Sequence, residues 1–298
     1  MFYKGFRFQG VVPAMVTPFT PMGELDLEGL KASINLVVKN GVWGVLVSGS
    51  TGEAASLTRE ERIKVTETAA KAAGGRVKVI TGTGAPSTAE TIRLSMDAKA
   101  AGADAVLVVT PYYLMATQEG IFKHYKAIND AVDLPILAYN IPAHTGSDIQ
   151  MTTLERLAAL ERIAGMKESS GRGWYMADSI AHVGDKLALI EGGDDTLYPG
   201  LCIGASGCIL ALGNIAPAQA VGIYNAVKAG DHAKARQMYF QVLPIARAIS
   251  VSVNFPAGVK AALEMLGRSA GPCRSPIQPL TSQEAADLRQ ALVASKLL

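Results

Sequence analysis

The chain has 298 residues, of which 49% are hydrophobic and 18% are charged, with 28 Lys and Arg against 26 Asp and Glu. This composition excludes an intrinsically disordered chain, because the apolar surface is large enough to offset the entropy lost on folding. The formal net charge of +2, with basic residues scattered among acidic ones, excludes the usual pattern of a nucleic-acid-binding protein. We therefore expect one large α/β barrel or two smaller domains, with no nucleic-acid partner.

The location expected from the sequence is the cytoplasm. The longest apolar runs, such as residues 105–109, are far shorter than the ~20 residues that a membrane helix needs. Residues 1–10 contain no continuous apolar segment of signal-peptide length. The three cysteines are odd in number and lie in apolar or loop segments, which is typical of reduced thiols.

Short segments rich in β-branched residues alternate with longer segments whose apolar positions recur at helical spacing. Strands are predicted at residues 11–16, 44–47, 77–81, 105–109, 135–139, 163–167, 187–190 and 207–210. Helices are predicted at residues 27–39, 58–73, 88–101, 118–131, 152–160, 175–182 and 217–229, whereas the glycine-containing segment 197–204 is left unassigned. Eight strands in this alternation predict the α/β class, with a parallel sheet closed into a (β/α)8 TIM barrel.

The last segments break this alternation. Helices are predicted at residues 231–251, 257–266 and 282–295, with no strand between them. We therefore expect residues 1–229 to form the barrel that carries the active site. Residues 230–298 should form a C-terminal helical domain that packs directly against the barrel.

Lys167 is the most informative single residue, because it ends the apolar strand predicted at 163–167. Functional residues of a parallel barrel gather at the carboxyl ends of its strands. Burial there favours a neutral amine, which can attack a carbonyl carbon to form a Schiff base. The alternative is that Lys167 pairs with Glu168 or Asp194 and stabilises the barrel rim.

Hydroxyl groups are available beside this lysine. Tyr139 ends the neighbouring predicted strand, where its phenol can carry protons to and from an adduct on Lys167, with Ser50 and Tyr113 as relays. The structural alternative is a core tyrosine with a satisfied hydroxyl. The turn at residues 49–52 offers backbone N–H groups to an anion, although glycine-rich turns of this kind are common.

Taken together, these motifs resemble those of the dihydrodipicolinate synthase and N-acetylneuraminate lyase family. The matching segments are residues 49–53, Leu57, Thr58, Glu60, 111–113, 139–142 and 165–168, and the likeness runs from residue 16 to residue 280. The resemblance implies a (β/α)8 barrel with a C-terminal helical domain, usually in a homotetramer. It further implies a class I aldolase, a carbon–carbon lyase that binds pyruvate as an imine.

The resemblance also assigns roles to individual residues. It implies the pyruvate imine on Lys167 and a proton shuttle at Tyr139. Ser50 and Thr51 would bind the pyruvate carboxylate and complete the relay, and Tyr113 would reach the site of a neighbouring subunit.

Three positions bear on the second substrate. His144 stands where dihydrodipicolinate synthases have an arginine that binds the carboxylate of aspartate semialdehyde, and a neutral imidazole lacks the bidentate guanidinium. Ser50 stands where synthases typically have threonine. Ile209 lies in the apolar segment 208–212, where sialate lyases keep polar groups for a polyol.

We therefore expect an enzyme that cleaves or forms a 2-keto-3-deoxy sugar acid from pyruvate and a small, uncharged aldehyde. The alternative is dihydrodipicolinate synthase, which condenses pyruvate with aspartate semialdehyde in lysine biosynthesis. A protonated His144 would still hold a carboxylate in that case. His144 also has a structural interpretation, as a loop histidine bonded to backbone.

Other classes of protein fit less well. The four histidines are scattered and no cysteine pair has metal-ligand spacing, so we expect no metal. The acidic group Glu191, Asp194 and Asp195 is better explained as a cap or a substrate contact. Residues 82–84 lack the third glycine of a dinucleotide fingerprint, so we expect no cofactor. A non-catalytic pyruvate sensor is a remote alternative, because it has no use for a reactive amine beside a phenol.

Overall fold

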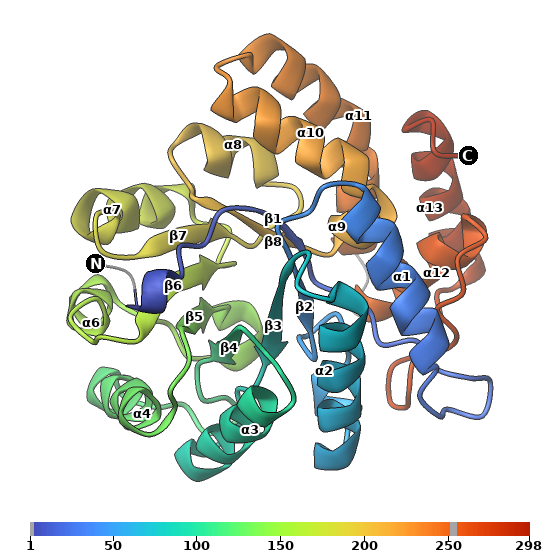
Figure 1. Cartoon of the computed structure of the whole chain (residues 1–298). Helices are drawn as coiled ribbons and strands as arrows, with labels where there is room; N and C mark the ends of the chain where they lie inside the picture. Colours follow the sequence, from blue (N-terminus) through green and yellow to red (C-terminus); the bar gives the residue numbers. More distant parts are fainter. Residues whose placement is uncertain (1–2, 251–254) are drawn as a thin grey trace.

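The computed structural model describes residues 3–250 and 255–298, in which eight parallel strands surround one axis and helices lie outside them (Figure 1). The strands are β1 (Gly10–Pro13), β2 (Gly44–Val47), β3 (Lys78–Gly82), β4 (Ala105–Val109), β5 (Ile136–Asn140), β6 (Ile163–Glu168), β7 (Ala188–Glu191) and β8 (Gly207–Leu210). β1 pairs with β8, and a parallel bridge between Ala14 and Leu46 joins the end of β1 to β2. The expected (β/α)8 barrel is therefore confirmed.

Helices connect the strands and cover the outside of the barrel. They are α1 (Leu27–Lys39), α2 (Arg59–Ala73), α3 (Thr88–Ala100), α4 (Gln118–Ala131), α6 (Met151–Leu157), α7 (Gly173–Val183), α8 (Leu197–Cys202) and α10 (Pro217–Lys228). Capping residues explain several of their starts: Thr58 forms a capping box with Glu61, and Ser87 and Thr117 cap α3 and α4. α8 occupies the segment that the sequence left unassigned.

Short helical turns in the loops were not predicted. They are η1 (Tyr3–Gly5), η2 (Ala54–Ser56), α5 (Pro142–Thr145) and α9 (Leu212–Ile215). Each is four residues or fewer, too short for helical spacing of apolar residues to show in the sequence.

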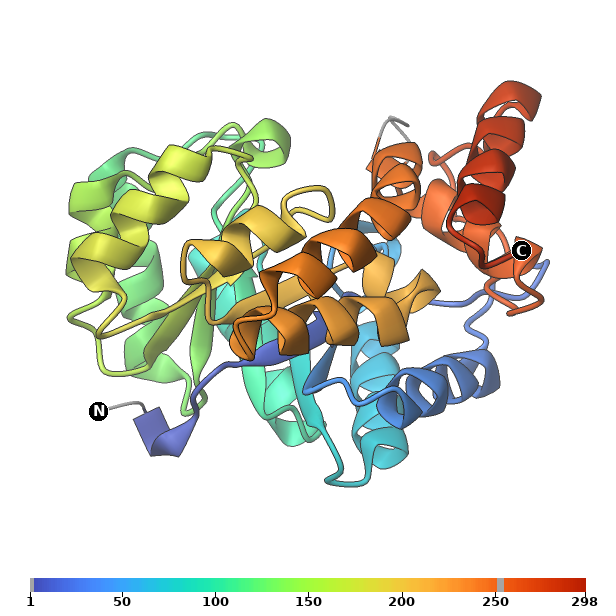
Figure 2. The same ribbon diagram turned by 90° about the horizontal axis from the view of Figure 1, so that it is seen from above.

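Three further helices follow the barrel: α11 (His232–Ser250), α12 (Phe255–Met265) and α13 (Ser282–Ala294). Figure 2 shows α12 and α13 together at one end of the molecule. One hydrophobic core contains side chains of α8, β8, α10 and all three of these helices. The predicted helix 231–251 ends at a residue outside the described ones, and the division into units of 1–229 and 230–298 stays a prediction.

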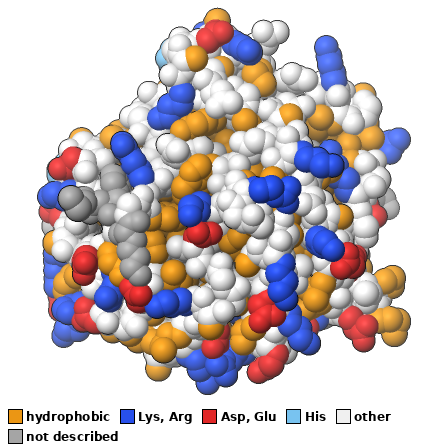
Figure 3. Space-filling model, in the orientation of Figure 1, with side chains coloured by type: hydrophobic (Ala, Val, Ile, Leu, Met, Phe, Trp, Pro, Cys, Tyr) orange, Lys and Arg blue, Asp and Glu red, His pale blue; other side chains and the backbone are white. Residues whose placement is uncertain are grey.

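Basic and acidic side chains are interspersed over the face in Figure 3. Among residues 3–250 and 255–298, every helix falls short of the length or hydrophobicity needed to cross a bilayer.

The register of β6 changes once along its length. Ile136 of β5 pairs with Ile163, but Leu137 pairs with Gly165, so Ala164 is an extra residue in β6. Such a β-bulge changes which face of the sheet the following side chains occupy. Ile163 packs in the outer core against the helices, whereas Ala164 packs in the core inside the barrel.

The bulge determines which way the end of β6 points. A Cβ atom on Gly165 would lie 3.2 Å from Leu137 Cδ2, so this position also faces the barrel interior. Met166 then packs in the outer core. Lys167 consequently pairs with Tyr139, whose side chain belongs to the inner core.

Candidate active site

Lys167 and Tyr139 lie side by side at the carboxyl end of the barrel. They are register partners on β6 and β5, and they are 6% and 5% exposed. Lys167 Nζ lies 4.3 Å from the centre of the Tyr139 ring. The structure therefore brings together the amine and the phenol that the sequence predicted to be neighbours.

The carboxylates that could pair with Lys167 have other partners. Glu168 accepts hydrogen bonds from Asn140 Nδ2 at 2.8 Å and from the Ser170 backbone N–H at 2.5 Å. Asp194 Oδ1 accepts a hydrogen bond from the Leu212 N–H at 2.8 Å. Within residues 3–250 and 255–298, Lys167 forms no ion pair with either group. The interpretation of Lys167 as a rim-stabilising residue is therefore not supported.

Three buried carboxyl groups surround this end of the barrel. Burial raises the pKa of Glu191 to about 7, although hydrogen bonds from the Gly193 N–H and the Thr196 hydroxyl oppose the shift. Burial likewise raises the pKa of Asp194 to about 6 and that of Glu168 above its usual value. The positive charge of Lys167 partly offsets the shift at Asp194. The described residues contain no group of three side chains that could hold a metal.

The turn after β2 carries Ser50 and Thr51. Its two ends, Ser48 and Glu53, both have left-handed backbones with φ of 53°. Hydrogen bonds from Gly52 N–H to Gly49 O at 3.1 Å and from Glu53 N–H to Ser50 O at 3.0 Å close the turn. Thr51 is buried, and Ser50 is exposed.

Tyr113 does not join Tyr139 within one chain. It is 89% exposed, and its backbone is left-handed with φ of 72°, which is unfavourable for a bulky residue. Leu114 and Met115 beside it are 78% and 73% exposed. In the described part of the chain, neither Ser50 nor Tyr113 forms a side-chain hydrogen bond with Tyr139, so the relay is incomplete in the single chain.

The residues expected to select the aldehyde lie in different surroundings. His144 is exposed on α5, and its ring forms no hydrogen bond with the described residues, so the backbone-bonded interpretation is not supported. Ile209 is 1% exposed and belongs to the same inner core as Tyr139.

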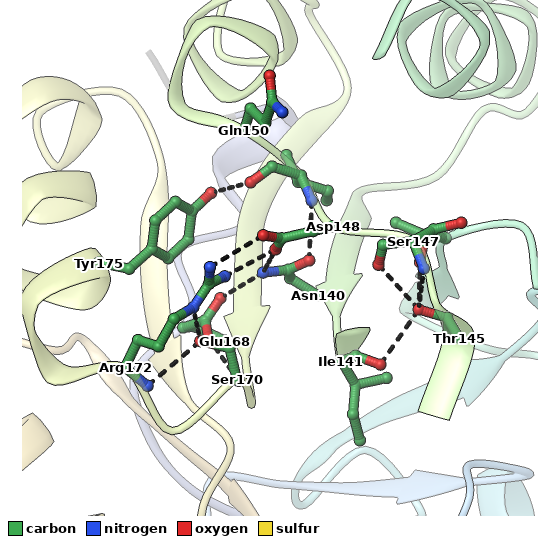
Figure 4. A network of polar contacts seen from close by, with 12 residues as sticks. Asn140, Ile141, Thr145, Ser147, Asp148, Gln150, Glu168, Ser170, Arg172 and Tyr175 are labelled. Carbon is green, nitrogen blue, oxygen red and sulfur yellow. Dashed lines mark hydrogen bonds and ion pairs between the residues drawn. The ribbon is translucent and has the colours of Figure 1, made fainter. Parts of the chain in front are cut away.

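A polar network joins the loops that follow β5 and β6 (Figure 4). Arg172 donates to both carboxylate oxygens of Asp148, at 2.9 and 2.7 Å. Asn140 Nδ2 bridges Asp148 at 3.0 Å and Glu168 at 2.8 Å, and Arg172 Nε donates to Ser170 Oγ at 2.9 Å. This network fixes the ends of both strands. Asp148 and Arg172 were not singled out from the sequence, because they lie 24 residues apart and meet only in the fold.

Ser169 is a further residue that the sequence did not single out as a site residue. Its hydroxyl is buried and has no hydrogen-bond partner among the described residues. A Cβ atom on Gly192 would collide with Ser169 Oγ and lie 2.8 Å from Lys167 Cε. The absence of a side chain at Gly192 therefore makes room for both groups.

The model of the Dihydrodipicolinate synthetase family matches residues 7–295. The chain belongs to this family. Similar proteins include two 4-hydroxy-tetrahydrodipicolinate synthases. The synthase of Syntrophobacter fumaroxidans is 40% identical over 98% of this chain and 100% of its own length. That of Protochlamydia amoebophila is 41% identical over 95% of each chain.

Solved structures of the dihydrodipicolinate synthetase family have the same fold. The synthase of Acinetobacter baumannii complexed with pyruvate superimposes with a TM-score of 0.95 and is 36% identical, covering 97% of this chain and 99% of that one. The synthase of Thermotoga maritima also superimposes with a TM-score of 0.95. It is 35% identical and covers 98% of this chain and 100% of its own. The protein is accordingly a carbon–carbon lyase of the class I aldolase type, which uses a lysine Schiff base with pyruvate.

Proposed function

We propose that the protein is a 4-hydroxy-tetrahydrodipicolinate synthase that condenses pyruvate with aspartate semialdehyde through an imine on Lys167. The observation that carries the proposal is the buried amine of Lys167 beside the Tyr139 phenol, 4.3 Å from Nζ to the ring centre. Relatives about 40% identical over almost the whole chain support this aldehyde better than the sugar-acid substrate that the sequence favoured.

The proposed chemistry uses residues of the carboxyl end of the barrel. Lys167 Nζ attacks C2 of pyruvate, and loss of water from the carbinolamine leaves the imine. Tyr139 donates the proton that leaves with the water and accepts one as the pyruvate methyl group forms the enamine. The enamine carbon then attacks the aldehyde carbon, and an incoming amine or water releases Lys167. Ser50 and Thr51 hold the pyruvate carboxylate throughout.

His144 is the residue that we assign to the carboxylate of the semialdehyde, in its protonated form. The guanidinium of Arg172 is already held by both oxygens of Asp148, so it is not available for a second carboxylate. A protonated imidazole supplies one charge-assisted hydrogen bond in place of the two of a guanidinium.

A 2-keto-3-deoxy sugar acid aldolase is the second candidate. The exposed imidazole of His144 in place of an arginine and the unpartnered hydroxyl of Ser169 favour an aldehyde that carries hydroxyl groups and no charge. In this case Ser169 would donate to or accept from a hydroxyl of the aldehyde.

Comparing kcat/KM for condensation of pyruvate with aspartate semialdehyde and with glyceraldehyde tests the assignment. The synthase should prefer the semialdehyde, and His144→Ala should reduce that preference by about tenfold or more, since a charge-assisted bond is lost. Ser169→Ala is the matched control, and it should reduce only the reaction with glyceraldehyde. A preference for glyceraldehyde would establish the second candidate. Imine formation without condensation with either aldehyde would support the alternative of a non-catalytic pyruvate sensor.

We further propose an oligomer, at least a dimer and most simply a homotetramer, in which Tyr113 enters a neighbouring subunit's site. The exposed run of Tyr113, Leu114 and Met115 supports this, because contiguous exposed apolar side chains mark interaction surfaces. The hydrogen bond from Ser147 Oγ to Pro111 O at 2.8 Å anchors the loop that carries them. The cytoplasmic location stays a prediction.

A further inference from the structure

Glu53 ends the turn that carries Ser50 and Thr51, and its conformation needs support. Its backbone is left-handed with φ of 53°, and its side chain is fully buried. A residue other than glycine adopts this conformation only where its surroundings hold it there. What holds Glu53 therefore also sets the shape of the turn.

The groups that hold Glu53 come from the C-terminal part of the chain. Lys260 Nζ of α12 lies 2.7 Å from Glu53 Oε1, and the two side chains are 3% and 0% exposed. The backbone N–H of Arg274 donates to Glu53 Oε2 at 2.8 Å. Lys260 Nζ also donates to Pro272 O at 2.8 Å and lies 4.3 Å from the centre of the Phe19 ring. Both oxygens of the Glu53 carboxylate are thus held by residues more than 200 positions away.

Arg274 braces the segment that follows the turn. Its guanidinium donates to Ser56 O at 2.8 Å and to both carboxylate oxygens of Glu61, at 2.7 and 2.5 Å. Its Nε and Nη2 donate to Gly23 O at 3.0 and 2.8 Å. Residues 48–61 are therefore joined to the C-terminal chain by two separate basic side chains.

The burial of the ion pair indicates a role other than stability. A buried ion pair gains little stability over apolar side chains of similar volume, because both charges must be removed from water. Such a pair does fix the two groups at one mutual position. Here the fixed carboxylate belongs to the last residue of the turn that would bind pyruvate.

We propose that Glu53 and Lys260 are positioning residues for the pyruvate carboxylate, through which α12 holds Ser50 and Thr51 in their binding geometry. Neither residue touches the substrate. The inference rests on the proposed function of that turn, and it assigns part of the pyruvate affinity to the C-terminal helices.

The test replaces the ion pair by neutral groups of similar size, Glu53→Gln with Lys260→Met, which keeps the packing and leaves no unpaired charge. We expect a folded protein whose KM for pyruvate rises about tenfold, while kcat and the KM for the aldehyde stay within about threefold. The pyruvate concentration for half-maximal borohydride trapping should rise by the same factor. The single variant Lys260→Arg, which keeps Glu53 and the positive charge, should have a KM for pyruvate between those of the wild type and the doubly substituted variant.

Arg268→Met is the matched control. Arg268 also joins the C-terminal chain to the barrel, but it donates to Asn214 O and Ile215 O, away from the turn. Its loss should lower the melting temperature and leave the KM for pyruvate unchanged.

The outcomes separate this inference from the proposed function. The inference alone would be overturned if the wild-type protein and the doubly substituted variant were both trapped with pyruvate at the same half-maximal pyruvate concentration. An equal rise in the pyruvate KM of Arg268→Met would also overturn it, because the effect would then be general to the C-terminal contacts. A wild-type protein that pyruvate and borohydride never modify would overturn both.

Discussion

Lys167 and Tyr139 are paired residues of β6 and β5, and the Lys167 amine lies over the Tyr139 ring at 4.3 Å from its centre. Both side chains are buried within the end of the barrel. A carbonyl compound that reacts with the amine is therefore placed beside a phenol. This arrangement allows bond formation and proton transfer at adjacent atoms.

The imine should form on Lys167 and at no other lysine. Incubation with pyruvate and borohydride should add one pyruvate-derived mass per chain, located by peptide mass spectrometry. Lys167→Met should abolish the modification, whereas Lys126→Met, at an exposed lysine, should not change it. EDTA should leave the activity unchanged. Modification at a different lysine would exclude the assigned nucleophile.

Replacement of Tyr139 should affect turnover more than folding. Tyr139→Phe keeps the ring in the inner core but removes the hydroxyl, so kcat should fall by roughly 10² to 10⁴, the range for loss of a general acid or base. Ser50→Ala should act in the same direction and more weakly. Steady-state kinetics and thermal melting measure the two effects, and an unchanged kcat would show that the proton moves by another route.

The raised pKa of Glu191 should make the folded state less stable as the pH rises. Its native pKa of about 7 exceeds the ordinary value of 4.5, so between these values the native protein retains a proton that the unfolded chain has released. The free energy of unfolding should therefore fall by up to about 3 kcal/mol from this group as the pH increases from 4.5 to 7.

Glu191→Gln isolates this effect, because its amide oxygen can still accept the bonds from Gly193 and Thr196. Urea unfolding at several pH values should show a smaller loss of stability for the variant than for the wild type. Asp97→Asn is the control. The hydrogen bond from Arg59 lowers the pKa of Asp97, so this carboxyl changes the free energy of unfolding only at lower pH. If the free energy of unfolding fell equally with pH in Glu191→Gln and in the wild type, the prediction would be contradicted.

Tyr113 should act between subunits. Sedimentation should give a dimer or larger particle, and Tyr113→Ala should lower kcat. Mixing and reassembling Tyr113→Ala, which has a lowered kcat, with Lys167→Met, which lacks the nucleophile, should raise activity above that of either variant, because a hybrid site receives an intact lysine from one chain and an intact tyrosine from the other. A fully active monomer would rule the arrangement out.

Much of the barrel could be predicted from local sequence. Buried parallel strands are rich in β-branched residues, and the ends of those strands revealed Lys167 and Tyr139. The predicted strand 11–16 was too long, because β1 ends at Pro13. Of residues 14–16, Ala14 forms an isolated bridge to Leu46, and the Val16 N–H donates to the side chain of Asn214.

The remaining features of the site depend on contacts between distant residues. The Glu53 and Lys260 ion pair joins positions 207 residues apart, from 53 to 260, and no local pattern records it. The unpartnered hydroxyl of Ser169 is visible only once Gly192 is packed against it. The outward placement of Tyr113 depends on a left-handed backbone that the sequence of its loop did not indicate.

The extra residue in β6 makes the facing of Lys167 depend on where the length of the strand changes. Ala164 and Gly165 both face the barrel interior, so a chain without Ala164 would alternate strictly from Ile163 to Lys167 and would keep Lys167 inside. Removal of Met166 would instead turn Lys167 toward the surrounding helices, although no residue of the active site had been replaced. A homologue that aligns with a one-residue gap at Ala164 should therefore retain its inward lysine, whereas a gap between Gly165 and Lys167 would need a compensating insertion before the lysine.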